Sequence, residues 1–240
     1  MPKPSRTSSR RGDSLSRDRI VDAAIELLDK GGEDALTFRA LSEALGTGPG
    51  AIYWHIADKS DLMTAACDAV VVRTLDACAR ETTPKATIRA VALGLFDAMD
   101  AHAWVGSALM RAAARLPAMR LIERIGQQVR ASGVAEGAQW ATVSALLPYI
   151  VGVGGQNAAN ARHAQANGLV RDDFLASVAS TWEQLPPQDW PFVHAMAGHF
   201  AAHDDRADFL TGIDLLLRGM GSGSRQPSST RRLTAPRAGA

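Results

Sequence analysis

The chain has 240 residues, of which 46% are apolar and 21% are charged, and its formal net charge is +1 at pH 7. This composition is typical of a globular protein with a substantial core, and it excludes a largely disordered chain. No stretch approaches the roughly 20 consecutive apolar residues of a membrane span, and no apolar signal segment follows the basic start. We therefore expect a cytoplasmic protein with no membrane partner.

Both ends of the chain are predicted to be disordered basic tails. Residues 1–12 contain four basic side chains and no acid, and residues 221–240 contain four arginines and no acid. Both segments are rich in Ser, Pro and Gly, which is typical of disordered termini. We place the tails at 1–15 and 220–240.

Four helices are predicted in the N-terminal part, at 17–30, 38–45, 49–56 and 59–81. Three of them begin directly after a residue that can cap a helix N-terminus, namely Ser16, Thr37 and Asp58. The helix at 49–56 begins at Pro49, which is favoured at the first position of a helix. Gly31 and Gly32 are expected to end the first helix. The first three helices predict a small domain at 16–64, followed by a long connecting helix.

The remaining helices are predicted at 85–101, 103–114, 118–132, 136–165, 171–184 and 204–218. Pro148 and the glycines that follow it predict a kink or an interruption in the segment 136–165. Cys67 and Cys78 lie in one helical pattern, too far apart for a disulfide, and are interpreted as small buried residues. The fold class is therefore all-α, with a larger C-terminal helical domain at 65–219.

The second and third predicted helices, joined by a tight glycine-containing turn, have the spacing of a helix-turn-helix, whose second helix enters the DNA major groove. Tyr53, Trp54 and His55 are consecutive, so they cannot all point into the core of a helical domain. Three large, partly polar side chains on a small surface indicate a partner. Residues 1–62 hold nine basic and ten acidic side chains, so bulk charge does not itself indicate DNA.

The same region resembles the N-terminal signature of the TetR (tetracycline-repressor) family of transcriptional regulators. The matching segments, in order and without gaps, are Leu36–Leu41, Leu45-Gly46, Ala51–Ile56 and Asp58–Leu62. The Tyr-Trp-His triplet is most similar to the tetracycline-repressor branch. The resemblance covers residues 17–64, about a fifth of the chain, and implies a homodimer that binds double-stranded operator DNA.

The resemblance also assigns roles within this region. It implies that Thr37, Tyr53, His55 and Lys59 contact phosphates, and that Arg39, Pro49, Gly50, Ala51 and Trp54 face bases. Arg39 and Glu43 carry the only charges between Leu36 and Ala57, so Arg39 is the main candidate for reading a guanine. Gly48 and Gly50 replace the larger or polar residues common in the family, which predicts few contacts from the start of the recognition helix.

In this family the second domain supplies the dimer interface and a ligand cavity, and residues 208–217 resemble its last helix. That helix is expected to pack with part of 136–165 across the twofold axis. A cavity needs apolar walls and a few polar groups. The candidate ligand-binding residues are Phe96, Met99, His102, Trp104, Met110, Trp140, Asn157, Asn160 and Phe174. Ordinary core packing is the competing interpretation for each of them.

No metal site and no cofactor are expected. His199 and His203 are one helical turn apart, with His194 nearby, but the segment is rich in acids and small residues, which favours solvated histidines. Where the tetracycline-repressor branch places a metal-binding histidine, before Arg115, this chain has three alanines at 112–114. This departure argues against a magnesium–tetracycline effector.

The sequence therefore predicts a ligand-responsive DNA-binding transcriptional regulator, a repressor released from a palindromic operator by a small apolar effector. The alternative is a helical small-molecule carrier or an enzyme without DNA activity. Catalysis is not expected, because the chain has no GxSxG, P-loop, dinucleotide glycine motif or HExxH. A constitutive architectural DNA binder without a cavity is a third interpretation.

Overall fold

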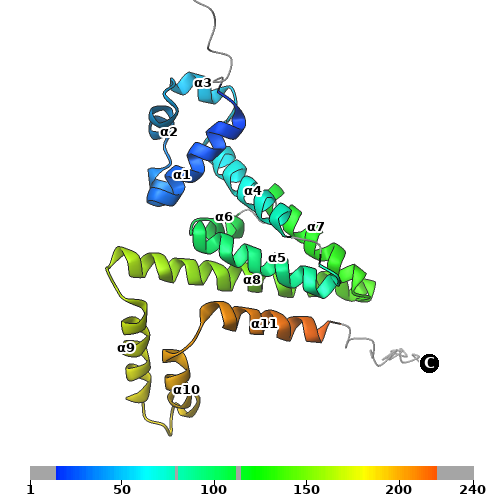
Figure 1. The fold of residues 1–240 in the computed structure, drawn as a ribbon, viewed down its shortest axis with the longest axis vertical. Helices are drawn as coiled ribbons and strands as arrows, with labels where there is room; N and C mark the ends of the chain where they lie inside the picture. The colour runs from blue at the N-terminus through cyan, green and yellow to red at the C-terminus, as the bar shows by residue number, and fades with distance from the viewer. Residues whose placement is uncertain (1–14, 79–80, 112–114, 221–240) are drawn as a thin grey trace, which may run out of the picture.

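The computed structural model describes residues 15–78, 81–111 and 115–220, and these residues form an all-α fold without β-strands (Figure 1). This confirms the predicted fold class. The helices are α1 (Arg17–Ala35), α2 (Phe38–Leu45), α3 (Pro49–Tyr53), α4 (Lys59–Ala77), α5 (Pro84–Ala101), α6 (Val105–Arg111), α7 (Leu116–Ala131), α8 (Glu136–Ala166), α9 (Arg171–Glu183), α10 (Pro191–Ala201) and α11 (Asp205–Gly219).

The predicted caps of the N-terminal helices are confirmed. The side chain of Ser16 accepts the Arg19 N–H at 3.3 Å, that of Thr37 accepts the Ala40 N–H at 3.1 Å, and that of Asp58 accepts the Asp61 N–H at 2.8 Å. Gly46 ends α2 in the left-handed region, with φ of 62°. These local hydrogen bonds satisfy N–H groups that a helix leaves free at its start, which is why the starts were readable from sequence.

Three helix ends in the N-terminal part differ from the prediction; α4, for example, ends at Ala77 instead of Glu81. α3 ends at Tyr53 instead of Ile56, because the chain turns at Trp54 and His55 to bring Ile56 into the core. α1 extends to Ala35 instead of Lys30, although its path bends at Gly32, where φ is 67° and ψ is −161°. Gly32 thus breaks the helix as expected, but the chain resumes one short helical turn beyond it.

α4 connects the N-terminal helices to the rest of the molecule (Figure 1). It packs against α1 at one side and against α5, α6 and α7 further along, so most of the buried residues form one continuous core, which does not include those of α9 and α10. Cys67 is fully buried in this core, and burial together with the neighbouring Asp68 raises the pKa of its thiol to about 12. This agrees with the interpretation of Cys67 as a small apolar residue; Cys78 is half-buried at the end of α4.

The sequence predicted a kink or an interruption in the segment 136–165, and the interruption is wrong, because α8 is one helix from Glu136 to Ala166 with Pro148 inside it. Its glycines allow close packing of helices. A Cβ at Gly106 of α6 would lie 2.8 Å from the Cα of Gly155, and a Cβ at Gly154 would lie 2.2 Å from the terminal methyl of Met99. Small residues in α8 therefore bring α5 and α6 close to its axis.

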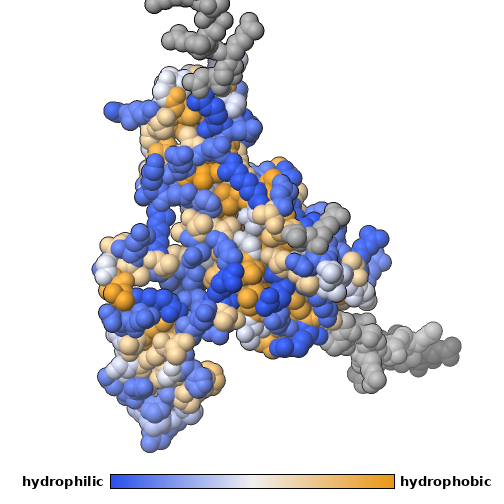
Figure 2. Space-filling view, in the orientation of Figure 1, coloured by the Kyte–Doolittle hydropathy of each residue, from blue (hydrophilic) through white to orange (hydrophobic). Residues whose placement is uncertain are grey.

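α10 was not predicted, and it forms a helical hairpin with α9 that projects from the body of the molecule (Figure 1). Apolar side chains are exposed at the turn between α8 and α9, where Leu169 is 44% and Val170 is 61% accessible (Figure 2). None of the described helices is both long and apolar enough to cross a membrane.

The predicted tails fall almost entirely outside the described residues. Their inner ends are packed, however: Leu15 contacts the core and Met220 is buried. Lys85 donates from Nζ to the carbonyl oxygens of Leu217 at 2.7 Å and Met220 at 3.2 Å, which anchors the end of α11 to the start of α5. The folded part therefore includes one more residue at each end than the sequence predicted.

Candidate DNA-binding surface and ligand pocket

The recognition surface is centred on Trp54, whose side chain is the most exposed large apolar group described, at 89% accessibility. Tyr53 is 55% accessible, and its ring stacks on Phe38 of α2 with a centroid distance of 4.6 Å. Ile52 and Ile56 are fully buried beneath them. The core side of α3 therefore holds the aromatic residues on the outer side in place, which is the arrangement expected for contact with a partner.

The other predicted DNA-binding residues surround these aromatic side chains. Thr37, Pro49 and Gly50 are exposed, whereas Ala51 and His55 are half-buried. The hydroxyl of Thr37 caps α2, which fixes this side chain at the N-terminus of that helix. Thr37 thus lies at the N-cap of α2, Pro49, Gly50 and Ala51 form the start of α3, and His55 follows its end, so these residues cluster around the second helix of a helix-turn-helix arrangement.

Two basic side chains on this surface have partners within the chain. Arg39 is exposed and donates to Glu43, one turn further along α2, at 3.0 Å. Lys59, the first residue of α4, donates from Nζ to the carbonyl oxygen of Glu33 at 2.7 Å. Both contacts are solvent-exposed and of low energy, so either cation can exchange its partner for a phosphate or a base.

Asp61 fixes the start of α4 against α1. Its carboxylate accepts the Ala57 N–H at 3.0 Å and the Arg17 guanidinium at 3.0 Å. Partial burial raises the pKa of Asp61, but the Ala57 N–H and Arg17 lower it more, so the pKa lies below the usual aspartate value. Asp61 therefore reaches back to the N–H of the residue that precedes Asp58, the cap of α4.

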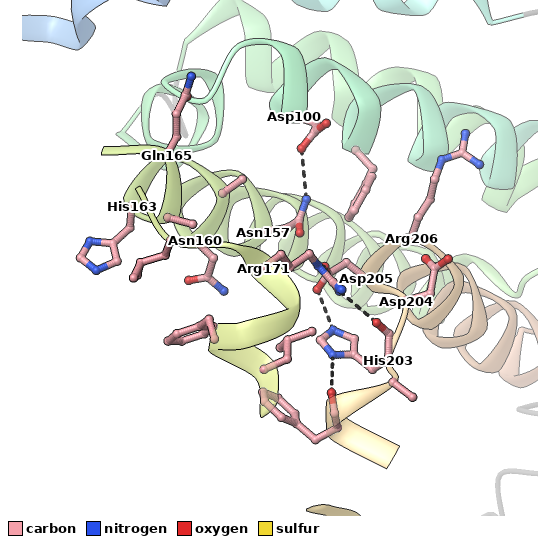
Figure 3. Close-up of a pocket in the computed structure, with 18 of the residues that line it drawn as sticks. Asp100, Asn157, Asn160, His163, Gln165, Arg171, His203, Asp204, Asp205 and Arg206 are labelled. Atoms are coloured by element: carbon pink, nitrogen blue, oxygen red, sulfur yellow. Dashed lines mark hydrogen bonds and ion pairs between the residues drawn. The ribbon is translucent and has the colours of Figure 1, made fainter. Parts of the chain in front are cut away.

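A pocket of about 1190 Å³ lies between α8, the α9–α10 hairpin and the start of α11 (Figure 3). Four of the predicted ligand-binding residues line it: Phe96, Asn157, Asn160 and Phe174. Its apolar wall includes Leu175 and Phe200, and the rest of its wall is polar or charged. The sequence-based expectation of an apolar cavity with few polar groups therefore describes only part of this pocket.

The other five predicted ligand-binding residues lie outside the pocket. Met99 is buried against Gly154, and Met110 and Trp140 are exposed, at 71% and 67% accessibility. His102 and Trp104 contact Asp29 of α1. Helical periodicity could not separate these roles, because pocket, core and surface positions on α5 to α8 carry the same residue types.

Ion pairs order the charged wall of the pocket. Arg206 binds Asp97 through two hydrogen bonds of 3.0 and 3.1 Å, which connects α11 to α5. Arg171 binds Asp205 at 2.7 Å, and His203 contacts the same carboxylate at 2.7 Å. Partial burial raises the pKa of Asp205, but Arg171 and His203 lower it more, so this group stays charged.

Most of these charged residues were not predicted from sequence to line a pocket, and His203 was predicted to be solvated. His203 is half-buried at the end of α10, where it contacts the Phe200 ring at a centroid distance of 5.4 Å and lines the pocket. The missed residues come from α5 and from the segment 171–206, about 70 residues further along the chain. Residues so far apart in the chain have no common spacing from which a pocket could be predicted. The pair Asn157 and Asn160, three residues apart on α8, was the only polar part of the lining that the sequence indicated.

A polar junction connects the end of α1 to the segment between α5 and α6. Asp29 accepts from Nδ1 of His102 at 2.9 Å and from Nε1 of Trp104 at 2.8 Å. Glu33 binds Arg111 of α6. Arg162 of α8 lies against the bend in α1, because a Cβ at Gly32 would be 2.7 Å from one of its guanidinium nitrogens. The N-terminal helices are thus attached to helices that also form the pocket.

Comparison with known proteins agrees with this geometry. Residues 20–66 match the family model described as bacterial regulatory proteins, tetR family. A solved transcriptional regulator from Streptomyces coelicolor, described as a TetR, is 49% identical with a TM-score of 0.78, and the match covers 86% of this chain and 98% of that chain.

Two further relatives show how the similarity is distributed. An HTH-type transcriptional regulator from Saccharopolyspora erythraea is 28% identical over 212 residues, which are 86% of this chain and 84% of that protein. The tetracycline repressor protein class D from Escherichia coli is 39% identical over 62 residues, 26% of this chain and 28% of that protein. Similarity to that repressor is therefore confined to one short segment.

Proposed function

The chain belongs to the TetR family of bacterial transcriptional regulators, and from this premise we propose that it is a ligand-responsive repressor, released from a palindromic operator by a small-molecule effector. One observation carries the proposal: Tyr53 and Trp54 are exposed next to each other at the end of α3, whose other side is anchored in the core through Ile52. The tetracycline repressors that match about 60 residues of this chain support repression as the direction of control.

The exposed aromatic residues fit the chemistry of a DNA groove. The Tyr53 hydroxyl can donate to a phosphate oxygen, and the Trp54 ring can lie against a thymine methyl group or a sugar. Lys59 lies at the N-terminus of α4, where free N–H groups add to the attraction for a phosphate. Phosphate contacts position the protein, and Arg39 remains the main candidate for reading a base.

We propose that two copies associate through α8 and α11. Every fourth residue of α11 is buried in the chain's own core, at Phe209, Ile213 and Leu217, whereas Leu215 faces outward and is 60% accessible. The outer side of α8 presents a stripe of small residues at helical spacing: Ala141, Ala145, Pro148 and Gly152. Small residues allow two helices to approach closely, so this face fits a twofold helical interface.

The pocket and the junction support control by an effector. Asp100 lines the pocket and lies two residues before His102, which holds Asp29 of α1. Arg162 lies between the pocket residues Ala161 and His163 and contacts the bend in α1. A ligand that displaces α5 or α8 would change the contacts of α1, and with them the separation of the two recognition helices.

Asp29→Ala is expected to loosen this junction. The substitution removes the acceptor of two hydrogen bonds, a loss of about 1–2 kcal/mol, so amide hydrogen exchange in residues 29–36 should accelerate by about tenfold. Asp22→Ala is the matched control, because Asp22 is also an α1 aspartate but pairs with Arg73 of α4. Equal exchange in the two variants would show that the junction does not hold α1.

Selection from random-sequence DNA, followed by gel-shift titration, tests the proposed function. We expect enrichment of a palindrome whose half-sites lie about 34–36 Å apart, one turn of DNA, or a multiple of that distance. Failure to enrich any palindrome would contradict the proposal. It would favour the second candidate, a small-molecule carrier without DNA activity, for which the pocket of about 1190 Å³ is the supporting observation. A carrier would also fail to bind heparin in a salt-dependent manner.

A further inference from the structure

The charged groups of the pocket are not balanced. Four aspartates and two arginines line it, and the arginines are already paired with Asp97 and Asp205. Asp204 caps α11 by accepting the Ala207 N–H at 2.9 Å, so the N-terminus of that helix stabilises its charge. Asp100 is the remaining carboxylate.

Asp100 has no cationic partner among the residues that the structure describes. Its side chain is exposed, and the one side-chain hydrogen bond that it makes within the described part of the chain comes from the neutral amide of Asn157, at 3.4 Å (Figure 3). It also lies in the last turn of α5, where free carbonyl oxygens carry a partial negative charge. A carboxylate in that position is repelled by its own helix, so the local potential favours a bound cation.

Aromatic rings lie at the same pocket. Phe96 is held by stacking on Phe209 at a centroid distance of 4.7 Å, and Phe200 is held by Trp182 at 4.5 Å. Phe174 of α9 is 45% accessible and has no ring contact among the described residues. These rings offer planar apolar surface, and their faces attract positive charge.

We propose that the pocket takes an amphipathic aromatic cation, with its positive group at Asp100 and its ring system against Phe174 and Phe200. This names the effector class for the proposed repressor and rests on that function. It replaces the small apolar effector expected from sequence. An organic anion would meet the excess of carboxylates and find both arginines already occupied, and a neutral apolar molecule would gain nothing from that negative charge.

Three xanthene dyes test the charge preference, because they share one ring system and differ in charge. We expect cationic rhodamine 6G to bind the full-length protein at least tenfold more tightly than zwitterionic rhodamine B or anionic fluorescein, as measured by fluorescence anisotropy. Asp100→Asn should weaken rhodamine 6G binding by about tenfold, and Asp100→Glu should restore most of it. Glu183→Gln removes an exposed charge at the end of α9, outside the pocket lining, and should leave binding unchanged.

Equal binding of the three dyes, or rhodamine 6G binding unchanged by Asp100→Asn, would overturn the inference. Circular dichroism of each variant checks folding, and Asp100→Glu remains informative if the asparagine variant does not fold. The proposed function is tested separately by operator selection without any dye. If the protein binds rhodamine 6G selectively but no operator is found, the cation site is supported and the repressor function is contradicted. If an operator is found but the three dyes bind equally, the repressor function is supported and the cation site is contradicted.

Discussion

Combining Tyr53→Phe with Lys59→Met is expected to weaken operator binding by at least about 100-fold while leaving the fold intact. Each protomer loses one hydroxyl donor and one cation, worth about 0.5–1.5 and 1.5–3 kcal/mol. A homodimer on a palindrome loses each contact twice, so even partial use of these groups exceeds the roughly 2.8 kcal/mol that corresponds to 100-fold. The measurement is a gel-shift titration of the selected operator.

The two substitutions are chosen to spare the core. Phenylalanine keeps the ring that stacks on Phe38, and methionine keeps the apolar stem of the lysine. Lys30→Met is the matched control, because Lys30 is an exposed α1 lysine paired only with Glu26 at 3.7 Å. If Lys59 neutralises one phosphate per protomer, as proposed, the slope of log K against log salt concentration should become shallower by about two in the double variant. Wild-type operator affinity in the double variant would refute the assignment of this surface to DNA.

Leu215→Arg is expected to weaken dimerisation by at least about 100-fold and, as a consequence, to abolish operator binding at nanomolar protein concentration. Near a twofold axis the same position appears in both subunits, so two like charges would be placed in one interface. Burying charges without partners costs several kcal/mol. In the separate chain Leu215 is 60% accessible, so arginine there should not disturb the protomer. Sedimentation velocity measures the change in mass.

Met119→Arg on α7 is the control, because Met119 is exposed to a similar extent, at 51%, on a helix outside the proposed interface. A Leu215→Arg protein that remains dimeric would show that the interface lies elsewhere. The exposed apolar side chains of the α9–α10 hairpin, among them Trp190 and Phe192, would then be the next surface to test.

The candidate sites were predictable to different degrees. The recognition surface follows from sequence because its residues lie within about 25 positions of one another, and caps such as Thr37 and Asp58 act over three residues. The pocket was predicted in part, since Phe96 and Phe174 are there but Met99 and Trp104 have other roles. Asp100 and His203 were not predicted to line the pocket. Their roles depend on the side chains that the fold brings next to them, which are Asn157 for Asp100 and Asp205 for His203.

The sequence by itself determined the all-helical fold, the starts of the N-terminal helices and the exposed Tyr53-Trp54 surface, because caps, periodicity and consecutive large side chains act locally. Only the tertiary structure decided that α8 runs unbroken through Pro148, that α1 is held by His102 and Trp104, and that no cationic side chain in the described ranges pairs with Asp100. These features depend on contacts between helices far apart in the chain. Packing and charge balance across such distances are set by the fold as a whole.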